Sequence, residues 1–216
     1  MLEIGTHTTL TVDRIKSPGA YLTNDNAEDV LLPNKYVSDD LQVGDEIEVF
    51  IYLDGEERIV ATTINPYIKL NDYAVLKANN VNKIGAFMDW GLEKDLFIPF
   101  REQDMKIIEG NSYLVYMYFD NQTERLVGST KLLKYLDNSN HKLQVRDKVD
   151  LIVWNSSELG TKVIINKKHL GLLYSNEVFK KLDFGQELTG FIKKTRSDDK
   201  IDVSLEEISY KNIEPN

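Results

Sequence analysis

Three copies of one glycine spacing constrain this chain more than any other feature. In each copy two glycines lie 25 residues apart, and the three pairs are Gly19–Gly44, Gly85–Gly110 and Gly160–Gly185. The second copy begins 66 residues after the first, and the third begins 75 residues after the second. Chance does not preserve such a spacing three times, so it predicts three similar units. We place these units at residues 1–66, 67–140 and 141–216.

Each unit contains five short segments whose alternating or apolar residues are typical of β-strands. We expect strands at 6–15, 20–24, 30–33, 46–53 and 58–64, then at 73–81, 85–90, 95–100, 112–119 and 125–132, and finally at 148–154, 160–165, 170–174, 187–194 and 200–207. Asp54-Gly55 predicts a hairpin turn between the last two strands of the first unit.

No segment shows sustained helical periodicity, and the connection between the third and fourth strands is short in the first unit. Residues 131–142 form a predicted linker with room for one helical turn. Five short strands in a unit of this size are typical of the OB-fold. We therefore predict an all-β protein of three tandem five-stranded OB-fold barrels.

The composition, 42% hydrophobic and 28% charged residues, is that of an ordinary soluble globular protein. The chain has no cysteine, which leaves no disulfide framework and no thiolate metal site. Residues 1–15 lack the basic and apolar regions of a signal peptide. No apolar run approaches the roughly 18 residues of a membrane span. We expect a cytoplasmic protein.

Charge is distributed unevenly along the chain. Residues 1–66 hold 4 Lys/Arg and 13 Asp/Glu, a net charge of -9. Residues 67–140 have a net charge of -1 (9 against 10), and residues 141–216 have +1 (13 against 12). Within 141–200 the balance is +4 (12 against 8). This polarity points to a charged partner for one end of the protein.

The sequence gives little support to catalysis. His7, His141 and His169 are far apart in sequence, and no cluster has metal-ligand spacing. Phosphate-loop, dinucleotide and nucleophile-elbow motifs are missing from the sequence. Paired carboxylates such as Asp39-Asp40 and Asp198-Asp199 fall in predicted loops and turns, where they are solvated. We predict a non-enzymatic protein with no metal and no cofactor.

The repeated pattern resembles the S-one RNA-binding domain, an OB-fold repeat. The resemblance lies in the motifs SPGAYL and KIGAFM, in Leu-x-x-Gly before a long apolar strand, and in the ending KIDVSLEE. Three such units with an acidic first copy resemble the conserved virulence factor B family of bacterial RNA-binding regulators. Members of that family typically add a C-terminal winged helix, whereas this sequence ends at SYKNIEPN. The expectation is a chain that lacks the winged-helix domain.

The resemblance implies where RNA would bind. In the S-one family an aromatic residue lies two residues after the first glycine, and the matching residues here are Tyr21, Phe87 and Lys162. A stacking histidine lies fourteen residues after that glycine, where this chain has Pro33, Pro99 and Tyr174. An arginine follows the hairpin, where this chain has Arg58, Arg125 and Lys200.

We expect the third unit to be the main RNA contact, because lysines surround Tyr174 there. The second unit would assist, and the first would be largely structural or face another partner. The predicted RNA-binding residues are Tyr21, Phe87, Trp90, Arg125, Lys162, Lys167, Lys168, His169, Tyr174, Lys193, Arg196 and Lys200.

Structural explanations compete with this assignment. Tyr21 and Phe87 could pack at a barrel mouth, since aromatic residues are common in strands. Lys167-Lys168-His169 could be a solvated turn, and Lys193-Lys194 alternates along a strand, so at most one of that pair shares the face. A second set, Phe50, Tyr116 and Phe191, lies 31 residues after each first glycine and predicts core or inter-repeat packing.

These observations predict a protein that binds single-stranded RNA, and the resemblance implies post-transcriptional regulation of virulence factors. The alternative is a protein-interaction scaffold whose acidic first barrel docks on a ribosomal or RNA-degradation protein. A third hypothesis is the substrate-feeding part of a ribonuclease.

Overall fold

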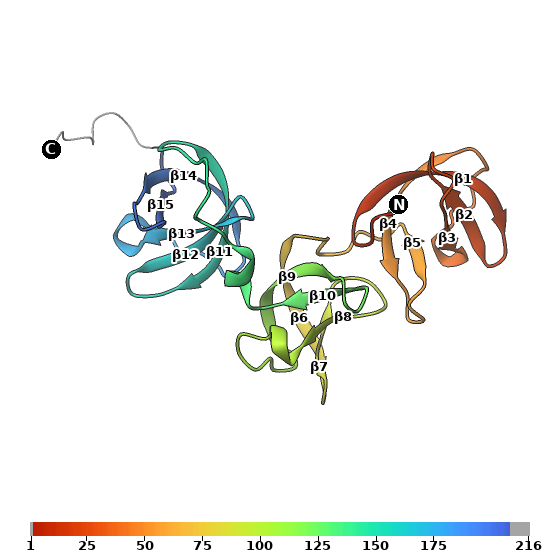
Figure 1. Ribbon diagram of the computed structural model, residues 1–216, viewed down its shortest axis with the longest axis horizontal. Coiled ribbons are helices and arrows are strands. Elements are labelled where there is room, and N and C mark those ends of the chain that lie inside the picture. The colour runs from red at the N-terminus through yellow and green to blue at the C-terminus, as the bar shows by residue number, and fades with distance from the viewer. Residues whose placement is uncertain (1, 208–216) are drawn as a thin grey trace. The chain divides into compact units, whose positions relative to one another are not determined.

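The computed structural model describes residues 2–207 and contains three five-stranded sheets, one for each glycine pair (Figure 1). The final motif, SYKNIEPN, lies outside the described residues. The predicted all-β fold is confirmed. Among residues 2–207, no helix is long and apolar enough to cross a membrane.

The first sheet is a closed barrel with the strand order β1-β2-β3-β5-β4. All neighbours are antiparallel except β3 and β5, which pair in parallel between Leu31 and Val60 and close the barrel. This is the topology predicted for an OB-fold. The strands are β1 (His7–Lys16), β2 (Gly19–Thr23), β3 (Asp29–Pro33), β4 (Glu46–Leu53) and β5 (Ile59–Thr62).

The second sheet has the order β10-β9-β6-β7-β8, and no ladder joins its two end strands, β8 and β10, in the described chain. Just after the short β8, Gln103 Nε2 donates to the Ile98 carbonyl at 3.1 Å and so holds the following segment against β8. The backbone N–H of Thr130 donates to the Glu102 carbonyl at 2.9 Å. The strands are β6 (Tyr73–Val81), β7 (Gly85–Asp89), β8 (Leu96–Pro99), β9 (Ser112–Asp120) and β10 (Arg125–Ser129).

The third sheet is again a closed barrel, with the order β11-β12-β13-β15-β14. Its strands are β11 (Lys148–Ser156), β12 (Gly160–Ile165), β13 (His169–Tyr174), β14 (Glu187–Thr195) and β15 (Ile201–Ser204). A single short 3₁₀ turn follows the third strand of every unit: η1 (Asn34–Tyr36), η2 (Phe100–Glu102) and η4 (Ser175–Glu177). The predicted linker holds one more such turn, η3 (Leu132–Tyr135).

The glycine spacing has two physical causes. At the first glycine of each pair, strand two approaches strand three so closely that a Cβ on Gly19 would lie 2.0 Å from the Leu32 carbonyl oxygen. The corresponding distances are 2.3 Å for Gly85 and 2.1 Å for Gly160. The second glycine of each pair has a left-handed backbone, with φ between 73° and 95°. Only glycine meets both demands without strain.

The first strand of each unit contains one register shift at the same distance before the glycine. The shifts lie between Val12 and Arg14, between Ala78 and Asn80, and between Val153 and Asn155. An extra residue on one strand bends it and increases its twist, which a small barrel requires. The repeat therefore extends to irregularities of the backbone.

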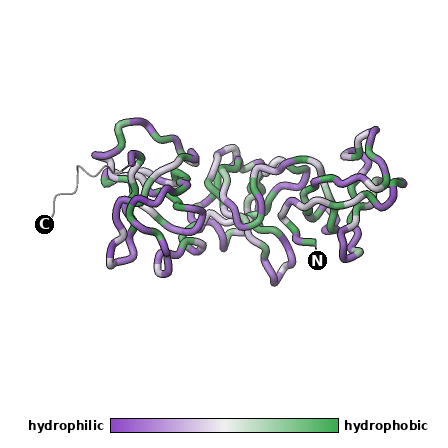
Figure 2. Tube along the Cα trace, turned by 90° about the horizontal axis from the view of Figure 1, so that it is seen from above, coloured by the Kyte–Doolittle hydropathy of each residue, from purple (hydrophilic) through white to green (hydrophobic). Residues whose placement is uncertain are grey.

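The chain forms two compact units, Met1–Thr130 and Lys131–Asn216. The first unit holds the first two barrels, which share a core: Phe50 and Tyr52 from β4 pack in one cluster with Trp90, Leu92 and residues of the second barrel. The third barrel has its own core. The stretches that project outward are largely hydrophilic, and hydrophobic stretches run through the inside of the chain trace (Figure 2). Inter-repeat packing, predicted for Phe50, is confirmed.

Candidate nucleic-acid interface

The second and third strands of each barrel place equivalent side chains on the outer face. The residues two and twelve positions after the first glycine are paired across these strands. The pairs are Tyr21 with Leu31, Phe87 with Phe97 and Lys162 with Leu172. OB-folds bind oligonucleotides on this face and under the adjoining loops. The three copies therefore present different chemistry from one geometric position.

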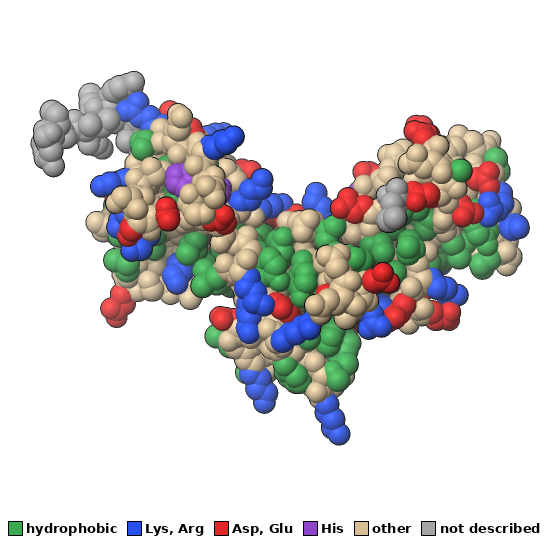
Figure 3. Space-filling view, in the orientation of Figure 1, with side chains coloured by type: hydrophobic (Ala, Val, Ile, Leu, Met, Phe, Trp, Pro, Cys, Tyr) green, Lys and Arg blue, Asp and Glu red, His purple; other side chains and the backbone are tan. Residues whose placement is uncertain are grey.

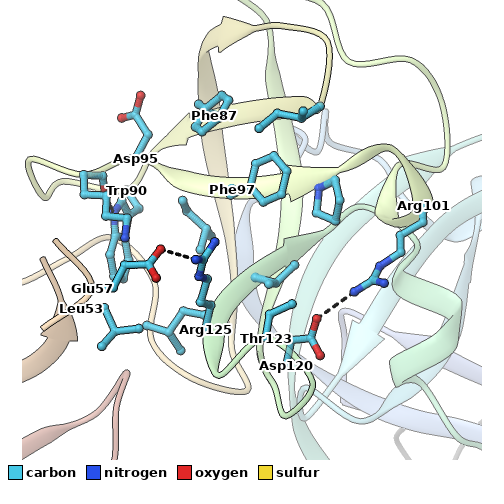
Figure 4. A pocket seen from close by; sticks show the side chains of 16 residues that line it. Leu53, Glu57, Phe87, Trp90, Asp95, Phe97, Arg101, Asp120, Thr123 and Arg125 are labelled. Carbon is cyan, nitrogen blue, oxygen red and sulfur yellow. Dashed lines mark hydrogen bonds and ion pairs between the residues drawn. The ribbon is translucent and has the colours of Figure 1, made fainter. Parts of the chain in front are cut away.

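The second barrel presents two aromatic rings at this position. Phe87 and Phe97 are half-buried, and their ring centroids lie 5.2 Å apart with planes tilted by 38°. Both rings line a pocket of about 530 Å³. Figure 4 shows them on the neighbouring strands β7 and β8, with Arg125 and Arg101 reaching the pocket below. Hydrophobic side chains gather over the first two barrels on the face shown in Figure 3.

Two arginines of this pocket are held by carboxylates. Arg101 lies 2.8 Å from Asp120, and Arg125 forms an ion pair with Glu57 on the β4–β5 hairpin of the first barrel. The two arginine side chains are 58% and 51% exposed, so phosphates can reach both. The backbone N–H of Gln122 is the main cause that keeps the pKa of Asp120 below its usual value, and Arg101 adds to it.

Trp90, a predicted RNA contact, is only 3% exposed. Its ring packs edge-on against Phe50 at 5.9 Å and Tyr52 at 6.5 Å, and its indole N–H donates to the Lys94 carbonyl. A buried ring offers no face on which a base can stack. Trp90 borders the pocket as part of the shared core, and we leave it out of the proposed contact surface.

The first barrel covers its aromatic residue. The guanidinium carbon of Arg14 lies 4.1 Å from the ring centre of Tyr21. Arg14 is held in place by Asp29 at 2.8 Å and by Asp13. The hydrogen bonds that Arg14 donates to these two carboxylates, first to Asp29, raise the pKa of Arg14. One face of Tyr21 is therefore occupied by a side chain of its own barrel.

The third barrel places three predicted cations beside carboxylates. Arg196 donates to Asp202 through Nε at 2.9 Å and Nη2 at 2.8 Å, and it also donates to the Tyr174 hydroxyl. The other two pairs are Lys193 with Glu177 and Lys200 with Asp198. A phosphate must compete with an acid at each of these groups.

The remaining predicted residues of the third barrel lie on β12, in the turn before β13 and at the first residue of β13. Lys162 lies over the ring of Trp154, with Nζ 5.9 Å from its centroid. Lys167 takes a left-handed turn conformation with φ of 59°, and Lys168 accepts a backbone bond from Asp137. Asp137 also bonds His169 Nδ1 through its carbonyl. This turn is thus hydrogen-bonded to Asp137 in the segment that leads into the barrel.

Sequence reasoning missed Phe97 and Arg101. The position of Phe97 carries leucine in the other copies, Leu31 and Leu172, so it was indistinguishable from a packing site. Arg101 has a counterpart in Lys35, two residues after Pro33, but Lys35 forms an ion pair with Glu93. The paired strands β7 and β8 are the signal that brings Phe97 to Phe87.

The described residues hold no group of three or more His, Asp or Glu side chains that could bind a metal ion. His141 and His169 lie near each other, with ring centroids 6.0 Å apart.

The chain is similar in sequence to known proteins. Residues 4–64 match the S1 (S-one) domain family model. The chain is 37% identical over 95 residues to the uncharacterized protein YitL of Bacillus subtilis, and 29% identical over 118 residues to conserved virulence factor B of Staphylococcus saprophyticus. These matches cover 44% and 50% of this chain but only 32% and 40% of the relatives.

A solved structure shares the fold. It is a multidomain protein with nucleic acid binding domains from Streptococcus pneumoniae, and it matches 98% of this chain and 76% of its own chain with a TM-score of 0.51 and 18% identity. The resemblance seen in the sequence is confirmed: residues 4–64 match the S1 domain, and half of the chain is similar in sequence to conserved virulence factor B.

Proposed function

We propose that this protein binds single-stranded RNA without catalysing a reaction, and that the second barrel is its main contact. One observation carries this proposal: the Phe87–Phe97 pair lines a pocket that also contains two exposed arginines. Unstacked bases bind aromatic planes while arginines neutralise phosphates, which is how OB-folds hold single strands. The S1 domain of the neighbouring barrel supports nucleic-acid binding as the function.

The third barrel, which the sequence favoured, is the secondary contact in this proposal. Its Tyr174 hydroxyl and three of its cations are already engaged by neighbouring side chains. The second barrel offers a concave apolar site, whereas the third offers paired charges. Stacking outweighs an exposed ion pair, because stacking contributes ~1–3 kcal/mol per base and an exposed pair ~0.2–1 kcal/mol.

The test is a fluorescence anisotropy titration with a labelled single-stranded RNA of about 12 nucleotides, a length within the range that OB-folds cover. The double variant Phe87→Leu, Phe97→Leu keeps apolar side chains but removes both rings. We expect it to bind about 5- to 150-fold more weakly, the equivalent of ~1–3 kcal/mol.

The matched control is Tyr174→Leu, which removes the aromatic ring of the third barrel. We expect it to bind nearly as tightly as the wild type. The reverse ranking would return the main site to the third barrel. A wild-type protein that binds duplex RNA as well as single strands would contradict the stacking mechanism, since bases in a duplex are unavailable.

In the cell we propose a cytoplasmic, post-transcriptional role. A link to virulence genes rests on the name of the relatives, conserved virulence factor B. Ribosomal or RNA-degradation proteins are candidate partners. Capture from lysate with and without ribonuclease tests this, because partners held through RNA are lost after digestion, and partners retained would favour a scaffold.

A further inference from the structure

The Arg125–Glu57 ion pair joins the most acidic barrel to the candidate RNA site of its neighbour. Glu57 lies at the tip of the β4–β5 hairpin, and both residues line the pocket that contains Phe87 and Phe97. The dashed line to Arg125 in Figure 4 ends on this carboxylate. A carboxylate of the first barrel therefore pairs with a cation of the second-barrel site.

The other acids of the hairpin are used within the first barrel. Asp54 accepts two hydrogen bonds from the guanidinium of Arg58, at 2.9 and 2.7 Å. Glu56 also pairs with Arg58, at 2.9 Å. Among the described residues, Glu57 is the only acid of this hairpin that forms an ion pair with the second barrel.

The hairpin is held against the second barrel by independent contacts. Lys94 Nζ donates to the Asp54 carbonyl at 3.0 Å, and Tyr52 at the end of β4 packs against Trp90. Glu57 itself has φ of 65°, a left-handed conformation that is uncommon for glutamate. Its carboxylate is thus presented to Arg125 by a fixed backbone.

A carboxylate and a phosphate compete for the same guanidinium, since arginine forms similar paired hydrogen bonds with both. Both side chains are about half exposed, at 51% for Arg125 and 46% for Glu57. An exposed pair of this kind contributes little to stability. Its larger effect would fall on whatever anion approaches Arg125.

We propose that Glu57 is an intramolecular competitor of RNA phosphate, through which the acidic first barrel limits the RNA affinity of the second. This inference rests on the proposed function. An RNA that offers phosphates alone must displace Glu57 without compensation, whereas one that also stacks bases on Phe87 and Phe97 gains the binding that offsets the displacement. The first barrel thereby favours single strands over other polyanions.

The experiment compares Glu57→Gln with Glu56→Gln in the full chain. Each removes one negative charge from the same hairpin, but only Glu57 touches Arg125 and lines the pocket. We expect Glu57→Gln to bind the labelled single-stranded RNA about 1.4- to 5-fold more tightly, as an exposed ion pair implies. The slope of log affinity against log salt should steepen by about 0.7, one phosphate on a single strand. Glu56→Gln should change neither quantity.

A double-mutant cycle completes the test. In an Arg125→Gln background the gain from Glu57→Gln should disappear. Equal gains from Glu56→Gln and Glu57→Gln, or a gain that persists without Arg125, would overturn the inference in favour of long-range charge. If Glu57→Gln does not strengthen RNA binding, this inference is overturned while the proposed function stands. A wild-type protein with no affinity for RNA overturns the proposed function and this inference together.

Discussion

The outer faces of the second and third barrels are built on one scaffold and differ in what they leave available. On the second, Phe87 and Phe97 lie together above a pocket with two exposed arginines. On the third, Lys162 replaces the first ring, and Arg196 is bound to both Tyr174 and Asp202. The third face is richer in lysine, yet three of its cations are paired with acids.

The difference shows that the number of cations is a poor guide to a nucleic-acid site. A lysine beside a glutamate presents little net charge to a phosphate, because the two potentials largely cancel at distances larger than the separation of the pair. Salt screens what remains over a Debye length of about 8–10 Å. The two arginines of the second pocket are also paired with acids, but its aromatic surface has no charged competitor. Geometry therefore favours the barrel with fewer cations.

The largest expected effect is on stability, and it should differ between the two compact units. Trp90→Ala removes a buried ring from the core that the first two barrels share, and we expect it to destabilise them by about 3–5 kcal/mol. The chain has two tryptophans, so in this variant the fluorescence of Trp154 reports on the third barrel alone. Urea unfolding should show an earlier circular dichroism transition and an unchanged Trp154 transition.

A shift of the Trp154 transition in the same variant would contradict the division at Thr130 and Lys131. The matched control is Trp154→Phe, in which Trp90 remains the sole reporter of the shared core.

The next prediction compares the removal of one cation from each face. Arg101→Gln should weaken RNA binding and flatten the salt dependence by about 0.7 in log–log slope, because one phosphate contact is lost. Lys193→Gln should leave the slope nearly unchanged, because in the proposed function the third barrel is only the secondary contact. The measurement is a set of titrations between about 50 and 200 mM salt. Equal slopes for the two variants would remove the distinction between the faces.

Acidification should destabilise the second barrel, through Asp120, more than it destabilises the third barrel through the exposed Asp198 pair. Hydrogen bonding, chiefly from Gln122, holds the pKa of Asp120 below its unfolded value. The stabilisation is therefore complete above about pH 3.9 and is lost as the pH falls through the lower folded value. Asp198 also has a lowered pKa, through Lys200, but it is 51% exposed against 9% for Asp120.

We expect the acid dependence of urea unfolding to shrink more in Asp120→Asn than in Asp198→Asn, because solvent screens the exposed pair. The opposite order would show that the Asp198 turn matters more than its exposure implies.

The smallest expected effect is a gain on the third face. Glu177→Gln releases Lys193, and we expect RNA to bind at most about 2-fold more tightly, near the lower end of what an exposed pair contributes. Anisotropy with the same labelled RNA measures it. A much larger gain would identify the third barrel as a site restrained by its own acids.

Much of the fold could be predicted because the glycine pairs and strand alternation are local. The strands at 46–53, 73–81 and 160–165 agree to the residue. The last strand of each unit was predicted too long, as in 125–132 against Arg125–Ser129. There the apolar Leu132 is buried at 1% exposure in a 3₁₀ turn after the strand, so apolar character continues where the ladder has ended.

The candidate site was harder to predict because it depends on distant contacts. Glu177 and Lys193 are 16 residues apart in sequence and meet only through the barrel. Glu57 and Arg125 come from different barrels. Trp90 resembled a binding residue because nothing in its own repeat shows that Phe50 of the preceding one covers it.

The shared core of the first two barrels has a consequence for how this protein can be dissected. The stretch recognised as a single S1 domain, 4–64, contains Phe50, Tyr52 and Val60, all buried in a cluster with residues of the second barrel. Expressed alone, that stretch would expose these apolar side chains to water. The smallest fragment that keeps this core intact is the pair of barrels, residues 1–130.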